Sequence, residues 1–194
     1  EVATVRAKVN RVTYTGALGY EIWVAPEYQR RLYQSIQDAG VDLGLRNFGM
    51  RALLCLRLEK HFGTWFREFR PIYGPFEAGL DRFVKLDKPD FIGKAAALKE
   101  KTEGPKRTRV CMVVDAVDTD VMGDEPIWVD GKVVGWVTSG GYGHWVDQSL
   151  AQGYIPTELV KPGMVMEIEI LGDRFPARLQ SEPPFDPQAQ RMRM

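Results

Sequence analysis

The segment VTYTGALGYEIWV, residues 12–24, carries the side chains best suited to binding a ligand. It places Tyr14 and Glu21 on either side of a glycine-containing turn, between two runs that resemble strands. On a strand, Glu21 and Trp23 share one face, because successive side chains point to opposite faces. A carboxylate beside a ring can accept hydrogen bonds from the donor-rich edge of a heterocycle. A solvent-exposed hairpin explains the same residues, so the spacing alone leaves both interpretations open.

Other common catalytic groups are sparse in this sequence. The two histidines, His61 and His144, fall in different predicted domains, and neither has a cysteine or histidine partner at metal-ligand spacing. The sequence therefore predicts no metal site. Cys55 stands among leucines, which favours a small apolar packing residue over a nucleophile.

Two further stretches have both a structural and a functional interpretation. The glycine-rich run TSGGYGHW, residues 138–145, could form an anion-binding nest, but no helix clearly follows it and a turn between strands fits better. The aromatic stretch 62–73 indicates packing beneath a long loop, although the stretch could also form one side of a flat ligand pocket.

The motif LRLEK, residues 56–60, places two opposite charges at the end of a predicted helix. Arg57 and Glu59 are two positions apart, and such residues do not face each other on a helix. We therefore expect each of them to form a structural ion pair with a different partner.

The composition sets limits on partners and on cellular setting. The chain has 194 residues and equal numbers of basic and acidic side chains, 26 of each, so no net field attracts nucleic acid or an anionic membrane. Two cysteines do not make a disulfide framework, and no apolar run approaches the roughly 18 residues typical of a membrane span. The sequence starts at Glu1 rather than methionine, which suggests a piece of a longer protein.

The first half of the chain mixes strand and helix patterns. Strands are predicted around residues 4–14 and 20–24, followed by a helix that Pro26 opens and Gly40 ends. A second helix over residues 48–59 has apolar residues around much of its circumference and is expected to be largely buried. Ordered loops are expected over residues 61–85. Asp90 is expected to cap a helix that begins at Phe91.

The second half reads as short strands separated by turns. Asp130-Gly131 between apolar runs predicts a type I′ hairpin, and Gly172-Asp173 predicts another. The polar stretch 102–108 has linker composition, and the tail after Glu182 is expected to fray. The predicted fold class is α+β: a mixed sheet-and-helix segment, residues 1–103, followed by a small antiparallel β-barrel, residues 104–194.

Four motifs follow one another along the chain, and their order is the basis of a family resemblance. They are RVTYTGALGYEIWV at residues 11–24, ALLCLRLEK at 52–60, the segment 77–98, and IWVDGKVVGWVTSGGY at 127–142. The set resembles the carboxy-terminal folate-binding region of dimethylglycine and sarcosine dehydrogenases. More broadly, it is similar to the aminomethyltransferase, or glycine cleavage T-protein, family. The resemblance runs from about Arg11 to Pro183.

The resemblance implies a tetrahydrofolate site. By the family pattern, Glu21 would contact the pterin and Tyr14 would lie at the folate, and we add Trp65 as a candidate aromatic wall. In the dehydrogenases, an amino-terminal flavin domain oxidises a methylated amine, and the folate region captures the carbon as methylenetetrahydrofolate. FAD is therefore expected only in an upstream domain, and the family's catalytic aspartate would lie upstream of residue 1. The chain alone is then not catalytically complete.

The chain departs from the family pattern at several positions. Ala17 stands where many relatives have glutamate, and Phe66 stands where they often have glycine. Leu53 replaces an arginine that contacts folate in the T-protein branch, which fits the dehydrogenase branch better. The alternatives are a flavin-independent folate-dependent demethylase or T-protein, and a non-catalytic folate-binding module. The expected location is the mitochondrial matrix in a eukaryote or the cytoplasm in a bacterium.

Overall fold

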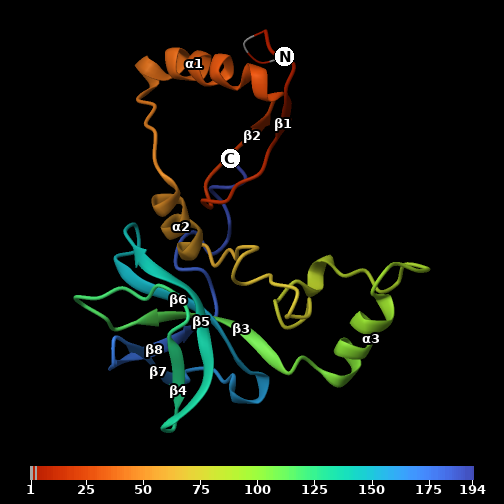
Figure 1. The fold of residues 1–194 in the computed structure, drawn as a ribbon, viewed down its shortest axis with the longest axis vertical. Coiled ribbons are helices and arrows are strands. Elements are labelled where there is room, and N and C mark those ends of the chain that lie inside the picture. Colours follow the sequence, from red (N-terminus) through yellow and green to blue (C-terminus); the bar gives the residue numbers. More distant parts are fainter. Residues whose placement is uncertain (1, 3) are drawn as a thin grey trace.

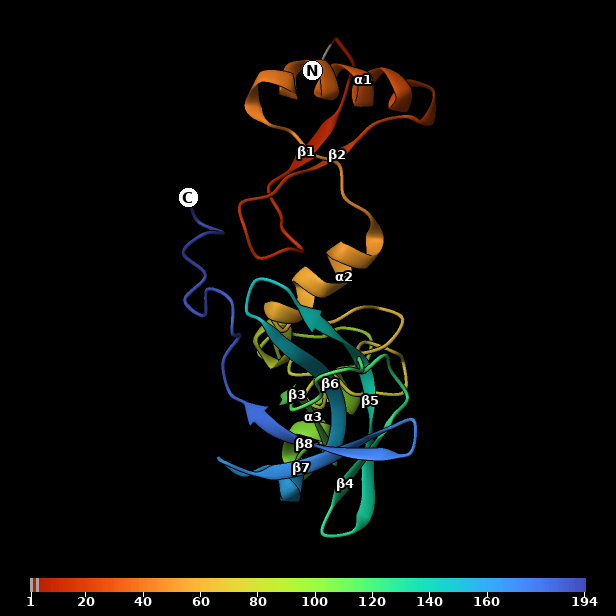
Figure 2. The same cartoon turned by 90° about the vertical axis from the view of Figure 1, so that its left-hand side faces the viewer.

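The computed structural model describes residue 2 and residues 4–194 of the chain. Figures 1 and 2 show a β-barrel at one end, helix α1 with a β1–β2 hairpin at the other end, and helix α2 between them. Helix α3 lies to one side of the barrel in Figure 1. The predicted class, an α+β segment followed by an antiparallel barrel, is confirmed. No helix in the described chain is long and apolar enough to cross a membrane.

The hairpin that carries the candidate site has short strands and a long loop. β1 (Lys8–Asn10) pairs antiparallel with β2 (Glu21–Trp23), which leaves residues 11–20 as the connection. The long first strand and the tight glycine turn that the sequence suggested are therefore wrong. The hydroxyl of Thr13 accepts hydrogen bonds from the backbone amides of Thr15 and Gly16, at 3.2 and 3.1 Å, and so replaces strand pairing with a local turn.

The first two helices lie where the sequence placed them. Pro26 begins a short 3-10 turn that leads into α1 (Gln29–Gly40), and α2 spans Met50–Glu59. The expectation that α2 is largely buried is wrong, because only its last turn is buried and Met50 remains 67% exposed. In Figure 2, only the carboxyl-terminal end of α2 approaches the barrel.

The third helix starts later than expected. The Asp90 carboxylate accepts a hydrogen bond from the amide of Phe91 at 2.8 Å, but α3 spans Lys94–Glu103. Gly93 immediately precedes it with φ of +90°, a left-handed conformation that a right-handed helix cannot contain. Asp90 thus caps a turn rather than the helix.

The barrel is closed, with strand order β3-β6-β5-β4-β7-β8 and antiparallel pairing throughout. Its core consists of the buried apolar side chains that point inward, among them Ile127, Ile155 and Ile168. The strand bounds are β3 Arg107–Val114, β4 Pro126–Val129, β5 Lys132–Gly143, β6 Gln148–Pro156, β7 Val165–Ile170 and β8 Asp173–Gln180.

Turn chemistry explains two of the barrel hairpins. Asp130 and Gly131 connect β4 to β5 with φ of 49° and 74°, the positive pair that a type I′ turn requires. Between β7 and β8 the positive-φ pair is Leu171 and Gly172, at 54° and 97°, so that turn begins one residue earlier than predicted.

The glycine-rich run 138–145 is mostly strand and not a turn. Residues through Gly143 belong to β5, and the β5–β6 turn begins only at His144. A Cβ added to Gly140 would lie 2.5 Å from the backbone oxygen of Val121, so that glycine permits close packing of a neighbouring segment.

The carboxyl-terminal tail packs against the end of α2, which contradicts the expected fraying. The Phe185 amide donates to the Glu59 carbonyl at 3.0 Å, and Lys60 forms an ion pair with Asp186 at 3.6 Å. The Arg191 guanidinium lies 5.2 Å from the centre of the Trp145 ring. The proline- and glutamine-rich composition concealed these specific contacts.

The division near residue 104 leads to a testable prediction. Gly104, with φ of +80°, and Pro105 separate α3 from β3, and Lys106 is exposed. Limited trypsin digestion is expected to cut first near Lys106 and to leave a folded barrel fragment, detected by mass spectrometry and circular dichroism. Uniform protection of the linker, or loss of strand signal after this single cut, would contradict the boundary.

Candidate functional site

Glu21 stands at the start of β2, opposite Asn10, and its side chain is exposed. Within the described chain, its carboxylate forms no side-chain hydrogen bond or ion pair. Trp23, two residues along the same face, is 60% exposed. The structure therefore leaves an acceptor and an aromatic surface open on the same side of this strand.

Tyr14 anchors the loop between β1 and β2 to the segment after α2. Its hydroxyl donates to the Gly63 carbonyl at 3.0 Å, and its ring stacks on Phe62 with centroids 6.4 Å apart and planes at 11°. Burial raises the pKa of Tyr14 above its ordinary value, so the phenol stays protonated. This hydroxyl already donates its proton to a hydrogen bond within the chain, but its oxygen can still accept a hydrogen bond from a ligand.

Trp65 projects from the loop that follows α2 and is 80% exposed. Its ring contact is edge-on to Phe69, at 6.2 Å and 76°. Within the described residues it shares no ring contact or hydrogen bond with Tyr14 or Glu21. The structure thus joins Tyr14 to the end of α2, but it does not join the three predicted folate residues by direct contact.

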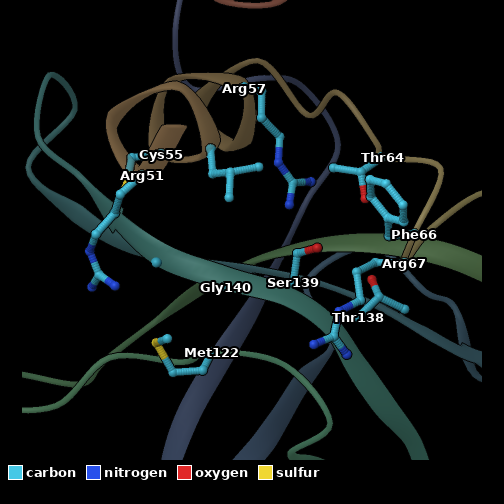
Figure 3. Close-up of a pocket in the computed structure, with 12 residues that line it drawn as sticks. Arg51, Cys55, Arg57, Thr64, Phe66, Arg67, Met122, Thr138, Ser139 and Gly140 are labelled. Carbon is cyan, nitrogen blue, oxygen red and sulfur yellow. The ribbon is translucent and has the colours of Figure 1, made fainter. Parts of the chain in front are cut away.

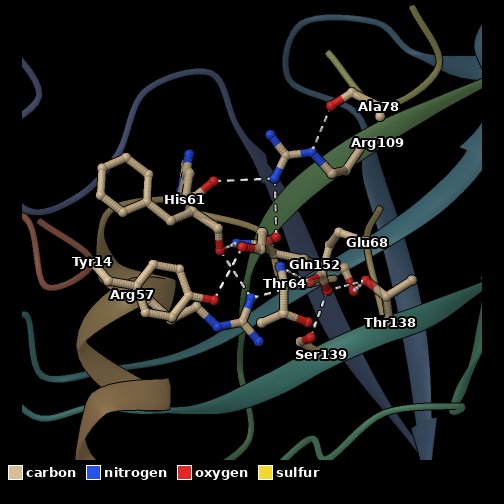
Figure 4. Close-up of polar contacts among 12 residues, drawn as sticks. Tyr14, Arg57, His61, Thr64, Glu68, Ala78, Arg109, Thr138, Ser139 and Gln152 are labelled. Atoms are coloured by element: carbon tan, nitrogen blue, oxygen red, sulfur yellow. Dashed lines mark hydrogen bonds and ion pairs between the residues drawn. The ribbon is translucent and has the colours of Figure 1, made fainter. Parts of the chain in front are cut away.

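A buried polar network, which the sequence analysis missed, lies beside Tyr14 (Figure 4). Glu68 is fully buried and forms an ion pair with Arg57 at 3.3 Å. One Glu68 oxygen accepts hydrogen bonds from the hydroxyls of Thr138 and Ser139, and the other accepts from the Thr64 amide at 2.7 Å. This carboxylate therefore fixes the loop after α2 against strand β5.

The two charges of LRLEK do have different partners, as their spacing predicted. Arg57 pairs with Glu68, whereas Glu59 accepts a hydrogen bond from the Trp145 amide at 2.8 Å. The predicted ion pair is therefore confirmed for Arg57 and is wrong for Glu59, whose partner is a backbone group.

A second arginine organises the other side of this network. Arg109 donates to the carbonyls of His61 and Ala78 and to the side-chain oxygen of Gln152, each at 3.1 Å. His61 adopts a φ of 58°, which is unusual for a residue other than glycine. Burial, followed by the nearby Arg109 charge, lowers the pKa of His61 to about 4, and the imidazole is therefore neutral at physiological pH.

His61 is expected to make the chain less stable in acid. Because its folded pKa of about 4 lies below its ordinary value of 6.5, the unfolded state binds more protons between these values. The free energy of unfolding should therefore fall as the pH drops from about 6.5 toward about 4. Urea unfolding at several pH values across this range measures the free energy of unfolding. The control His61→Asn tolerates positive φ and should show a shallower fall; identical slopes would contradict the prediction.

A pocket of about 300 Å³ lies between α2, strand β5 and the loop after α2 (Figure 3). Arg57 extends from α2 toward β5 in this view, with Thr64 and Phe66 on the loop side and Arg51 on the opposite side. None of the predicted folate residues lines it. Glu68 and this pocket could not be found from local spacing, because their partners lie on segments far apart in the sequence.

No group of three or more histidine, cysteine, aspartate or glutamate side chains in the described part of the chain is arranged to hold a metal ion. The polar groups gathered here are hydrogen-bond donors and acceptors suited to an organic ligand. A charged or heterocyclic ligand with an apolar portion matches this chemistry.

Comparison with known proteins agrees with these features. Residues 1–88 match the GCVT N-terminal domain model, and residues 107–186 match the glycine cleavage T-protein C-terminal barrel domain model. Mouse mitochondrial dimethylglycine dehydrogenase is 47% identical over 89% of this chain and 20% of the relative. An aminomethyltransferase of Desulfitobacterium hafniense is 33% identical over 92% of this chain and 49% of the relative.

A solved structure has the same fold. The aminomethyltransferase T of the Bartonella henselae glycine cleavage system superposes with a TM-score of 0.85 and 27% identity, over 92% of this chain and 50% of that chain. The present chain thus spans about a fifth of the dehydrogenase and about half of each aminomethyltransferase. With both domain models matched in order over most of its length, the chain belongs to the glycine cleavage T-protein family.

Proposed function

We propose that this chain is the tetrahydrofolate-binding part of an enzyme that captures the oxidised N-methyl carbon of a methylated amine as methylenetetrahydrofolate. Glu21 accepts hydrogen bonds from the pterin, Tyr14 holds the loop that borders the folate, and Trp65 offers an aromatic wall. FAD and the oxidation step belong to an amino-terminal flavin domain of the parent protein, and the catalytic aspartate lies upstream of this chain.

The observation that carries the proposal is the free carboxylate of Glu21 beside Trp23. Both side chains are exposed on one face of β2, and the carboxylate has no partner among the residues that the structure describes. A pterin presents adjacent N–H donors at one edge and flat ring faces, so an open acceptor next to an aromatic surface suits it.

The dehydrogenase branch is favoured over the T-protein branch. Identity to the mouse dimethylglycine dehydrogenase is 47%, against 33% to the aminomethyltransferase, and Leu53 stands where the resemblance places a folate-contacting arginine in T-proteins. Location in the mitochondrial matrix, for a eukaryotic source, follows from the same branch. A flavin-binding motif in the reading frame upstream of Glu1 would separate this branch from a flavin-independent demethylase or a non-catalytic folate module.

The direct test is a calorimetric titration of the full-length parent protein with tetrahydrofolate. Saturable binding that Glu21→Gln weakens is expected. Folate affinity that this substitution leaves unchanged would remove Glu21 from the site. The size of the effect is argued in the Discussion.

A further inference from the structure

The pocket between α2 and β5 has an unusual charge pattern. Three guanidinium groups line it, from Arg51, Arg57 and Arg67, whereas none of its lining residues carries a carboxylate. Arg51 and Arg67 form ion pairs at the surface with Asp120 and Asp124, at 3.8 and 2.8 Å. Because these pairs are exposed, water screens them and they bind their partners weakly.

Arg57 contributes a donor that has no partner. Its side chain is 4% exposed, and its Nη1 group donates to the Phe62 carbonyl at 2.9 Å and to Glu68 at 3.3 Å. Its Nε group is buried and has no hydrogen-bond partner in the described chain. Since Nη1 is occupied, the Nε edge of the guanidinium is the edge left for a ligand, and it matches the two oxygens of a carboxylate.

Thr64 supplies a second donor at the same place. Its amide donates to Glu68, but its hydroxyl is buried and unpartnered among the described residues. Figure 3 shows Thr64 and Arg57 both bordering the pocket. A buried polar atom without a partner carries a desolvation cost, so an acceptor bound here would relieve two such costs at once.

Part of the remaining wall of the pocket is apolar, although Thr138 and Ser139 of β5 also line it. Leu54, Phe66 and Met122 line it, and the pocket's volume of about 300 Å³ admits a small molecule. The arrangement therefore suits a ligand with one carboxylate and a short apolar portion.

We propose that this pocket binds the carboxylate of a small amphipathic molecule, with Arg57 Nε and the Thr64 hydroxyl as donors. The inference goes beyond the pterin contact, because Tyr14, Glu21 and Trp65 do not line the pocket. The carboxylate can come from a free amino acid or from the glutamate tail of a folate, and both offer the same acceptor.

The experiment is an NMR titration of the purified chain that follows the backbone amides of Thr64 and Ser139. Acetate and N,N-dimethylglycine test a free carboxylate, and p-aminobenzoylglutamate tests a folate tail without its pterin. Saturable shifts are expected for at least one source, and the source that saturates at lower concentration is the better ligand. Acetamide, which lacks the charge, should bind at least tenfold more weakly than acetate.

The decisive variant is Thr64→Val, which keeps the shape of the side chain and removes only the unpartnered hydroxyl. Its thermal midpoint should equal or exceed that of the unmodified chain, while its Kd for the carboxylate rises about tenfold. Thr102→Val, on exposed α3, is the matched control and should leave the Kd unchanged. If Thr64→Val does not fold, Arg51→Gln removes an exposed charge at the rim and should raise the Kd at low salt.

Three results would overturn the proposal. The first is no saturable shift with any of the three carboxylates, and the second is acetamide binding as tightly as acetate. The third is a Kd that folded Thr64→Val leaves unchanged or, if that variant does not fold, a Kd that Arg51→Gln leaves unchanged. Failure of the pterin contact gives a different result. Glu21→Gln would then leave folate affinity unchanged. The amide shifts that p-aminobenzoylglutamate causes at the carboxylate pocket would persist, because that ligand has no pterin.

Discussion

Replacing Glu68 with leucine is expected to lower the free energy of unfolding by about 3–5 kcal/mol. The substitution leaves the Arg57 guanidinium buried without its counter-charge. It also removes the acceptor used by the hydroxyls of Thr138 and Ser139 and by the Thr64 amide. The Ser139 hydroxyl and the Thr64 amide then lose their acceptor, which adds to the cost, whereas the Thr138 hydroxyl keeps its hydrogen bond to the Gln152 carbonyl at 3.1 Å. Urea unfolding at neutral pH measures the loss.

A double variant separates the lost ion pair from lost packing. Arg57→Met/Glu68→Leu removes both buried charges of this ion pair, so much of the stability should return relative to Glu68→Leu alone. Glu158→Leu changes an exposed glutamate and should alter stability by less than about 0.5 kcal/mol. If Glu68→Leu costs no more than Glu158→Leu, Glu68 does not hold this region together.

The second large effect concerns ligand binding by Glu21. Glu21→Gln keeps the size of the side chain but replaces one acceptor oxygen with a donor, which would face an N–H donor of the pterin. The loss should be roughly 1.5–3 kcal/mol, or on the order of 10- to 150-fold weaker tetrahydrofolate binding. Calorimetric titration of the full-length parent protein measures the change.

Two matched variants control this measurement. Glu27→Gln alters another exposed carboxylate, in the 3-10 turn before α1, and should leave folate affinity unchanged. Tyr14→Phe keeps the ring on Phe62 and removes only the hydrogen bond to Gly63, so its effect should be smaller than that of Glu21→Gln. If Glu21→Gln and the unmodified protein have equal folate affinity and equal thermal midpoints, Glu21 is an exposed strand residue with no role in folate binding.

The parts of the fold that local chemistry determines were predictable from the sequence. Asp130-Gly131 marked a hairpin because few residue pairs adopt two positive φ values, and the structure has that turn. Pro26 and Gly40 bounded the first helix for similar local reasons. The family motifs likewise singled out Glu21 and Tyr14, whose roles in folate binding remain predictions.

The parts that depend on distant partners were not predictable. Glu68 resembles a surface glutamate in the sequence FREFR, and only contacts with Arg57 and with strand β5 make it a buried acceptor. The apolar circumference of α2 suggested burial, yet only its last turn is buried. The tail looked polar and loose until its contacts with Glu59 and Lys60 were visible.

The position of the tail has a consequence for the order of folding. The Arg11 side chain, in the loop that carries Tyr14, donates to the backbone oxygen of Met194 at 2.6 Å, across 183 positions of sequence. The hairpins of the barrel join neighbouring segments, so they can form early, whereas contacts between distant segments form slowly. During synthesis, the loop of the candidate folate site therefore acquires its last contacts only after residues 185–194 have been made.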